Sequence, residues 1–431
     1  MLKLLSLKSE FSKNTAILIL GTLAAQSIPI LLQPFLRRIY SAEDFGAMAV
    51  YLTLFSMISI VSSLRYEAAI VLPKNNNLAA NILSLAFLIN IVICFLLLAT
   101  IVLLKDTIVT LINFPQKYSN YLYLLPFASC SFGIYQAMNS WLTRQKAFKA
   151  SANNKMVRRS SEGIVQTAAG IIKFQGGLFI GDLTGNAINA FFGIWQILKN
   201  NFQPEFISRK KIFYAFKKYI DFPKYNVIPT VLSNAATVLP FLFINKLYST
   251  ETVGYLDLSR LVLSIPLVFV SATVSQVFLQ QTAEKKNDSQ SIKKDIIEIL
   301  YFLLAIICIE LLLILLFGPQ LFKLVFGSNY SVSGVFSQIL VFGFVLNFIS
   351  STFSSIFITF EKIRLNSIWQ AIYFLAICSL YFLKGLDINQ FIIIYVVIEV
   401  AMHSIYILLM YKIVGNYERK IKYKTPPDAI I

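Results

Sequence analysis

Charged side chains inside long apolar runs are the residues of this sequence that could do chemistry. Burying a charge away from water is costly, so such residues usually have a partner or a task. The arginines of this kind are Arg260, Arg159 and Arg158, with Arg65 closing an earlier run. A planar guanidinium in an apolar region can hold a phosphate group in a two-pronged fork. These four arginines are the candidate cations of a substrate-binding site.

Acidic residues stand at helical spacing from three of these arginines. Glu162 follows Arg158 and Arg159 by four and three positions, and Asp257 precedes Arg260 by three. Residues at this spacing share one helix face and can form an ion pair. Each arginine therefore has two interpretations, as a substrate cation or as the partner of a nearby acid. Arg65 either binds a phosphate or contributes to the orientation of the chain in the membrane.

Glu399 and His403 are separated by four residues in the last apolar run, which places them on one helix face. Histidine titrates near neutral pH, so the pair could relay a proton. The alternative is a buried hydrogen-bonded pair. Glu310, in another apolar run, is a third titratable candidate without an obvious partner in the sequence.

The elements that must position these residues are membrane helices. Of the 431 residues, 57% are hydrophobic and 14% charged, whereas soluble domains carry about 25% charged residues. A membrane helix needs about 20 apolar residues, and uninterrupted runs of this length exclude a barrel. The predicted spans are 14–36, 45–64, 79–104, 118–141, 154–173, 176–198, 223–245, 252–280, 296–317, 332–360, 363–383 and 390–410. We therefore predict an all-α polytopic membrane protein with little room for an extramembrane catalytic domain.

The basic residues behind the net charge of +17 lie in the loops between spans and do not form a nucleic-acid-binding face. Lysines and arginines concentrate in alternate loops, which predicts that both termini are cytoplasmic. The basic start, 1–14, leads into an apolar run without a cleavage site and is predicted to be a retained first span. The four cysteines stand singly, so neither disulfides nor a metal site is predicted. No catalytic motif or cofactor motif is recognisable, so no enzyme activity is expected.

One short motif occurs twice. YSAEDFG at 40–46, between the first two spans, returns as YSTETVG at 248–254, between the seventh and eighth. Six helices separate the copies, and an even number gives both halves the same orientation. The predicted organisation is an N-terminal six-helix lobe, a basic cytoplasmic linker, a C-terminal six-helix lobe and a cytoplasmic tail, at 1–200, 201–222, 223–414 and 415–431.

Prolines fall in the first span of each half. Pro29 and Pro34 lie in the first span, and Pro229 and Pro240 in the seventh. A proline inside a helix removes a hydrogen bond and favours a kink, so these four residues are candidate gating hinges. In the sixth span, Gly177, Gly181, Gly185 and Gly193 form a stripe of small residues that favours close helix packing.

Four further motifs stand in order along the chain. They are PFLRRIYS at 34–41 followed by FG at 45–46, SLRYEAAI at 63–70, DFPKY at 221–225 and SQVF at 275–278. With these motifs the chain resembles the polysaccharide-transporter branch, the oligosaccharide flippases, of the multidrug/oligosaccharidyl-lipid/polysaccharide (MOP) exporter superfamily. The resemblance implies two parallel six-helix lobes around a central cavity, lined by the first, second, seventh and eighth spans and working by alternating access.

The resemblance also implies a function. It indicates a bacterial inner-membrane flippase for undecaprenyl-diphosphate-linked oligosaccharide repeat units of the O-antigen or capsule type, used in surface polysaccharide or lipopolysaccharide biosynthesis. Expected partners are this lipid-linked oligosaccharide, membrane lipids and a polysaccharide polymerase complex, with no nucleic acid. No cofactor is expected, and coupling to a proton or sodium gradient stays open.

Two other functions remain. A cation-coupled multidrug exporter of the same superfamily would carry cationic cargo, which Arg159 and Arg260 disfavour. A membrane polysaccharide polymerase or ligase would need a long external loop, whereas the longest external connections, 105–117 and 318–331, have ordinary lengths.

Overall fold

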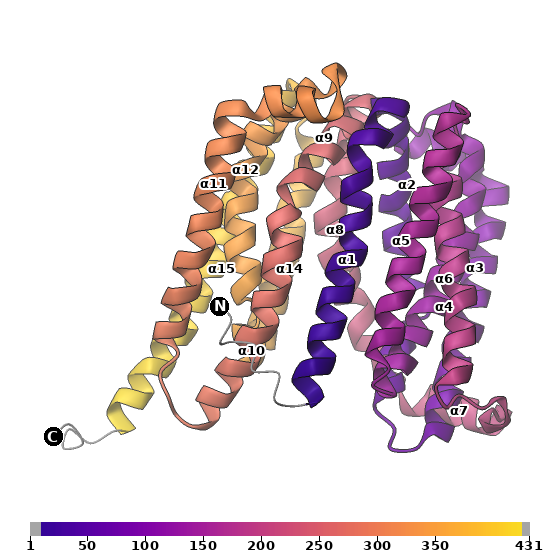
Figure 1. Cartoon of the computed structure of the whole chain (residues 1–431), viewed down its shortest axis with the longest axis vertical. Coiled ribbons are helices and arrows are strands. Elements are labelled where there is room, and N and C mark those ends of the chain that lie inside the picture. Colours follow the sequence, from indigo (N-terminus) through magenta and orange to yellow (C-terminus); the bar gives the residue numbers. More distant parts are fainter. Residues whose placement is uncertain (1–9, 425–431) are drawn as a thin grey trace. The chain divides into compact units, whose positions relative to one another are not determined.

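The computed structural model describes residues 10–424, and this range contains helices and no strands. Figure 1 shows long helices running side by side within each part of the chain. The helices are α1 Glu10–Ile39, α2 Ala42–Val61, α3 Asn76–Ile112, α4 Leu125–Arg144, α5 Phe148–Ile171, α6 Gly177–Lys199, α7 Arg209–Lys218, α8 Asp221–Leu247, α9 Thr250–Leu263, α10 Ala272–Asn287, α11 Lys293–Phe326, α12 Ser331–Phe353, α13 Ile356–Thr359, α14 Ile363–Cys378 and α15 Ile388–Lys424.

The predicted all-α membrane fold is confirmed, and every predicted span is helical. Within the described residues, seven segments are long and apolar enough to cross a membrane: α2, α3, α8, α11, α15, Ser328–Thr359 and Ile363–Phe382. The other predicted spans fall in α1, in α4 with the short helix before it, in α5, in α6 and in α9 to α10. Of these last spans, α4, α5 and α6 contain polar residues that reduce their mean hydropathy, and the eighth span is divided into α9, with 14 residues, and α10, with 16 residues. Three of the four candidate arginines lie in α5 and α9.

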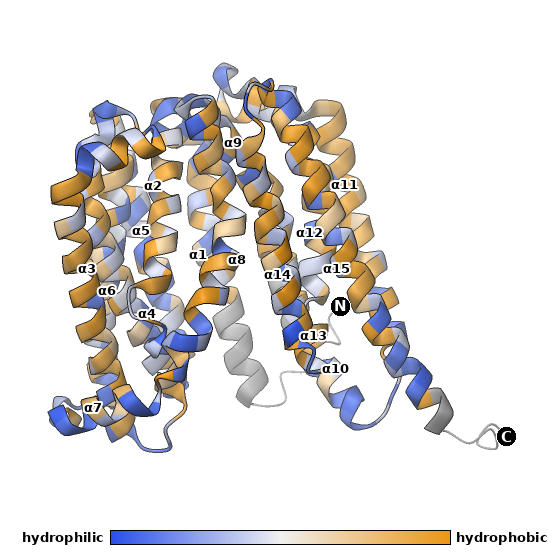
Figure 2. Ribbon diagram, turned by 180° about the vertical axis from the view of Figure 1, so that it is seen from behind, coloured by the Kyte–Doolittle hydropathy of each residue, from blue (hydrophilic) through white to orange (hydrophobic). Residues whose placement is uncertain are grey.

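Apolar side chains cover the outside of several helices, as expected for a surface in contact with lipid. On α3, Leu96 is 59% and Leu103 79% exposed, and on α11 Leu316 is 61% exposed. Figure 2 shows both helices as largely hydrophobic along their length. Exposed leucines at this density would be unfavourable in water and are compatible with a hydrocarbon environment.

The chain divides into two compact units, Met1–Gly254 (unit 1) and Tyr255–Ile431 (unit 2). The core of unit 1 includes Tyr66, Met138 and Trp141, and that of unit 2 includes Phe353 and Trp369. In unit 1, α8 packs against α2. The predicted lobes at 1–200 and 223–414 remain a prediction.

The predicted basic linker contains an ordered helix, α7. This helix packs against α3 and lies crosswise at one end of unit 1 (Figure 1). Ala215 is fully buried there, and the Tyr66 hydroxyl donates to the carbonyl of Phe216 at 3.0 Å. The Asn81 amide also donates to the carbonyl of Phe206 at 2.8 Å. Much of the predicted linker therefore packs against other helices of unit 1.

The predicted cytoplasmic tail begins as helix. Residues 415–424 continue α15, and residues 425–431 lie outside the described part of the chain. The N-terminal residues 1–9, which carry Lys3 and Lys8 of the predicted orientation signal, also lie outside it.

The predicted hinge prolines lie inside continuous helices, with Pro29 and Pro34 in α1 and Pro229 and Pro240 in α8. The eighth span, by contrast, is interrupted. The π-helical turn Leu267–Ser271 follows Pro266 and separates α9 from α10. Such turns occur frequently at functional sites within helices. Whether any of these positions bends during function stays a prediction.

Candidate functional site

The two copies of the repeated motif meet inside unit 1. A side-chain carbon added at Gly46 would lie 1.8 Å from the carbonyl oxygen of Thr250, and one at Gly254 would lie 1.9 Å from that of Ala42. Ala42 and Thr250 occupy the same position in the motif. The contact is therefore reciprocal: the first turn of α2 and the first turn of α9 touch through backbone, and only glycine permits this approach.

Polar groups fix both motif copies. Ser41 caps α2 by accepting from the Asp44 amide at 3.1 Å, while Asp44 accepts from the Ser41 amide at 2.8 Å. Arg37 is buried beside them and donates to the carbonyl of Gly254 at 3.1 Å. Arg37, which directly follows the first predicted span, thus connects the first motif region to the second.

The main polar network of unit 1 lies between α5 and α6, and the glycine stripe allows it to form. A side-chain carbon at Gly181 would lie 2.3 Å from Gln166, and one at Gly185 would lie 2.9 Å from Glu162. Because both positions lack a side chain, α6 approaches α5 closely. The approach places the charged residues of α5 against those of α6.

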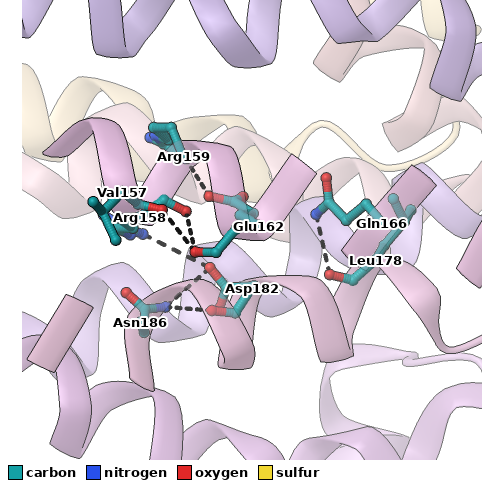
Figure 3. A network of polar contacts seen from close by, with 9 residues as sticks. Val157, Arg158, Arg159, Glu162, Gln166, Leu178, Asp182 and Asn186 are labelled. Atoms are coloured by element: carbon teal, nitrogen blue, oxygen red, sulfur yellow. Dashed lines mark hydrogen bonds and ion pairs between the residues drawn. The ribbon is translucent and has the colours of Figure 1, made fainter. Parts of the chain in front are cut away.

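Arg158 on α5 pairs with Asp182 on α6 (Figure 3). Its Nη2 lies 3.8 Å from Oδ1 of Asp182, whose side chain is 1% exposed. The Asn186 amide donates to the same Oδ1 at 3.1 Å, and the guanidinium of Arg158 lies 5.1 Å from the centre of the Phe132 ring. Helical spacing offers Glu162 as a partner for either Arg158 or Arg159 and does not reveal Asp182.

Arg159 pairs with Glu162 on its own helix. Nη1 of Arg159 donates to Oε2 of Glu162 at 2.9 Å. Figure 3 shows this pair on the α5 ribbon, while Asp182 and Asn186 lie on α6. The Arg159 side chain is 27% exposed, against 15% for Arg158. Arg159 is therefore the more accessible of the two cations.

Several polar atoms of this network lack a hydrogen bond within the described chain. They are Arg158 Nε, Asp182 Oδ2, Asn186 Oδ1 and the Tyr51 hydroxyl oxygen. A buried polar group without a partner is unfavourable, by about 1–3 kcal/mol. The network therefore has unused donors and acceptors that could accept another partner.

Unit 2 contains a second charged network, centred on Glu399 of α15. Its Oε2 lies 3.2 Å from Nε2 of His403, and its Oε1 accepts a short hydrogen bond from the Tyr373 hydroxyl. On its other side, Nδ1 of His403 lies 2.8 Å from the Ser350 hydroxyl. Glu399 and His403 are each only 6% exposed. Two hydrogen bonds and the contact between Glu399 and His403 therefore connect three helices, α12, α14 and α15.

Arg260 of α9 interacts electrostatically with this second network. Its positive charge affects Glu399, Tyr373 and Tyr395. Asp257 lies three residues before Arg260 on α9, and both side chains are partly exposed. The structure thus associates two candidates that the sequence treated separately, the arginine of the eighth span and the acid of the twelfth.

The remaining candidates lie elsewhere. Arg65 begins the short helix Tyr66–Val71 after α2, and its Nη1 lies 3.3 Å from Oε1 of Glu67. Glu310 is partly buried on α11, without a hydrogen bond or ion pair to another described residue. Neither belongs to the two networks.

Comparisons with known proteins agree with the fold. A family model described as "Polysaccharide biosynthesis protein" matches residues 35–335. No curated protein matches the chain.

Solved transporters of the MOP superfamily have similar structures. An inward-facing multidrug resistance transporter of the MATE family has a TM-score of 0.72 at 13% identity, covering 93% of this chain and 99% of that one. The lipid II flippase MurJ, in an inward closed conformation, has a TM-score of 0.70 at 15% identity, covering 96% and 91%. The Vibrio cholerae MATE transporter VcmN in its bent form has a TM-score of 0.60 at 15% identity, covering 94% and 96%. At these identities the likeness concerns the fold.

Proposed function

The chain belongs to the polysaccharide biosynthesis protein family, and we propose that it is a flippase that moves polyprenyl-diphosphate-linked oligosaccharide repeat units across the membrane. The family match, over residues 35–335, carries this proposal. The likeness to the MurJ lipid II flippase supports a lipid-linked substrate. The substrate is of the O-antigen or capsule class, and the membrane is the bacterial inner membrane.

Arginines in the membrane helices supply the chemistry that such a substrate needs. A diphosphate loses hydration when its head group leaves water, and fixed cations offset that loss. Arg159 and Arg260 are partly exposed; Glu162 accepts a hydrogen bond from Arg159 at 2.9 Å, and the charge of Arg260 interacts with that of Glu399. The carboxylate of Glu162 orients the guanidinium of Arg159 between cycles, and a phosphate can replace this carboxylate during transport. Arg158 is less exposed and keeps the α5–α6 network together.

Both termini face the cytoplasm in this account, and a polymerase complex receives the translocated unit. In a cycle coupled to a proton or sodium gradient, Glu399 and His403 are the groups best placed to exchange a proton, because contacts of 3.2 Å and 2.8 Å connect His403 with Glu399 and with Ser350.

A multidrug exporter is the second candidate, since MATE transporters share the fold. Its cargo would be cationic, and arginines at the substrate site would repel it. A membrane polymerase is less compatible with the connections of the chain. The predicted external connections 105–117 and 318–331 are largely taken up by α3, which continues to Ile112, and by α11, which continues to Phe326. Little external chain remains for an acceptor site.

Deletion of the gene in its host separates the three functions. A flippase deletion should abolish the surface polysaccharide and leave the lipid-linked repeat unit accumulating on the cytoplasmic side. A polymerase deletion should instead leave single repeat units at the surface. Unchanged polysaccharide with increased sensitivity to cationic drugs would contradict the proposal and favour the exporter.

A further inference from the structure

A pocket of about 460 Å³ lies between the start of α5 and the end of α6, outside the networks described above. Its walls are formed by aromatic, lysine and amide side chains together with two alanines, Ala147 and Ala150. The lining includes Lys149, Asn153, Phe192, Trp195, Gln196 and Lys199.

Cations and an aromatic platform form one wall of this pocket. Phe192 and Trp195 stack with their ring centres 5.3 Å apart, and Nζ of Lys199 lies 3.7 Å from the centre of the Trp195 ring. Lys149 is exposed on the α5 side. Two ammonium groups beside an aromatic surface suit a phosphate attached to a hydroxylated group, because the ring can lie against the apolar side of that group.

A buried amide points to a ligand independently. Gln196 is 5% exposed and lines the pocket, and its Oε1 has no hydrogen-bond partner in the described chain. An acceptor left in this state is unfavourable unless a donor from outside the chain reaches it. A hydroxyl group of a bound molecule would supply that donor.

The surface beside the pocket is apolar. Phe191, Ile194 and Leu198 lie at helical spacing on α6 next to Trp195, and all are exposed, Phe191 to 79%. In a membrane helix this stripe faces hydrocarbon. An occupant of the pocket can therefore extend a hydrocarbon chain along α6, which a soluble phosphate compound cannot do.

We propose that this pocket binds the phosphate-bearing, hydroxylated head group of a membrane lipid, with the hydrocarbon chain along the α6 stripe. Lys149 and Lys199 bind the phosphate, Gln196 accepts from a hydroxyl group, and Trp195 covers the apolar side of the head group. The ligand is either an anionic phospholipid of the bilayer or a polyprenyl-diphosphate lipid. The site does not depend on the flippase assignment.

Quenching of Trp195 fluorescence by lipids with brominated chains tests the site in the full-length protein reconstituted in phosphatidylcholine nanodiscs. Trp195 is 49% exposed, whereas Trp141 and Trp369 are buried, and a Trp195→Phe variant identifies its share of the signal. Brominated phosphatidylglycerol should quench Trp195 at about tenfold lower mole fraction than brominated phosphatidylcholine, as expected for one or two charge-assisted hydrogen bonds. Equal quenching by both lipids would overturn the proposal.

Substitutions separate ligand contact from folding. Lys149→Gln with Lys199→Gln should abolish the preference for phosphatidylglycerol, whereas Lys74→Gln with Lys173→Gln, two exposed lysines outside the pocket, should keep it. Gln196→Leu removes an acceptor that has no partner within the described chain, so the folded amount should not fall while the preference does. Retention of the preference in both pocket variants would overturn the proposal.

Competition identifies the source of the ligand. An unbrominated polyprenyl diphosphate that relieves quenching at lower mole fraction than unbrominated phosphatidylglycerol would assign the site to the lipid-linked substrate. Equal competition would assign it to bilayer lipid. Relief by soluble glycerol phosphate at a similar concentration would show that no hydrocarbon chain is needed and would contradict a lipid site.

Discussion

Gly46 and Gly254, the final glycines of the two motif copies, lie in mutual backbone contact at the starts of α2 and α9. A side-chain carbon at either position would lie 3.1 Å from the backbone nitrogen of the other glycine and less than 2 Å from a carbonyl oxygen. The repeat in the sequence is thus a repeat in space, with each copy completing the surface against which the other packs. In the predicted orientation this contact lies at the external end of unit 1.

Replacing either glycine should therefore disrupt folding or closure. Gly46→Ala and Gly254→Ala each force backbone apart, and we expect a loss of stability of at least about 3 kcal/mol, the upper end for overpacking. The melting temperature in detergent and the folded amount measure this effect. Gly415→Ala is the matched control, because no atom lies within 4 Å of an added side-chain carbon there. A melting temperature for Gly46→Ala equal to that of Gly415→Ala would contradict the contact.

Asp182 should be needed for folding more than for substrate contact. Asp182→Ala leaves Arg158 buried without its acid, which we expect to lower stability on the order of 3 kcal/mol. The double variant Arg158→Leu with Asp182→Leu removes both charges and should recover most of the melting temperature. A single variant as stable as the parent protein would show that the 3.8 Å pair is unimportant.

Arg260 should be needed for transport rather than for stability. Arg260→Lys should keep part of the activity, and Arg260→Ala should lower transport per folded molecule by roughly tenfold or more, the effect of one charged hydrogen bond. If Arg260 only neutralises acids, then Arg260→Ala combined with Glu399→Gln, or with Asp257→Ala, should restore activity. We expect both double variants to be folded and inactive. Surface polysaccharide per folded transporter is the measurement, and its recovery would exclude the substrate role.

The orientation can be tested by cysteine labelling in a chain whose four native cysteines are replaced by serine. Cysteines at Ser41 and Ser249 should react with an impermeant thiol reagent added outside intact cells, and a cysteine at Ser208 should not. Ser41 and Ser249 are both exposed. Labelling at Ser208, or at only one of the two motif positions, would contradict the predicted topology.

The sequence predicts the helices and the motif repeat well, because apolar runs of about 20 residues have only one fold compatible with lipid. It also places Glu162 beside Arg159 and Glu399 beside His403, since helical spacing alone fixes those neighbours. Contacts between different helices cannot be predicted in this way. Asp182 lies 24 residues after Arg158 and on another helix, so the pairing of these two residues could not be inferred from spacing.

Signals for some of the missed features were present. Asp182 is an acid within an otherwise apolar run, and Pro266 precedes the π-helical turn in the eighth span. The stripe of glycines on α6 indicated close packing but not the helix against which it packs. That choice depends on the fold of the whole unit, which places α5 beside α6 and brings the charges of the two helices together.

The proposed flippase activity can be measured directly as transport of lipid-linked oligosaccharide by the purified protein. The protein is reconstituted in vesicles containing a polyprenyl-diphosphate-linked oligosaccharide, and the fraction of sugar accessible to an impermeant glycosidase is followed over time. The flippase account predicts that this fraction rises from the outer-leaflet share toward completeness with the parent protein and far more slowly with Arg260→Ala. An accessible fraction that stays at the outer-leaflet share, with folded protein and across a range of ion gradients, would contradict it.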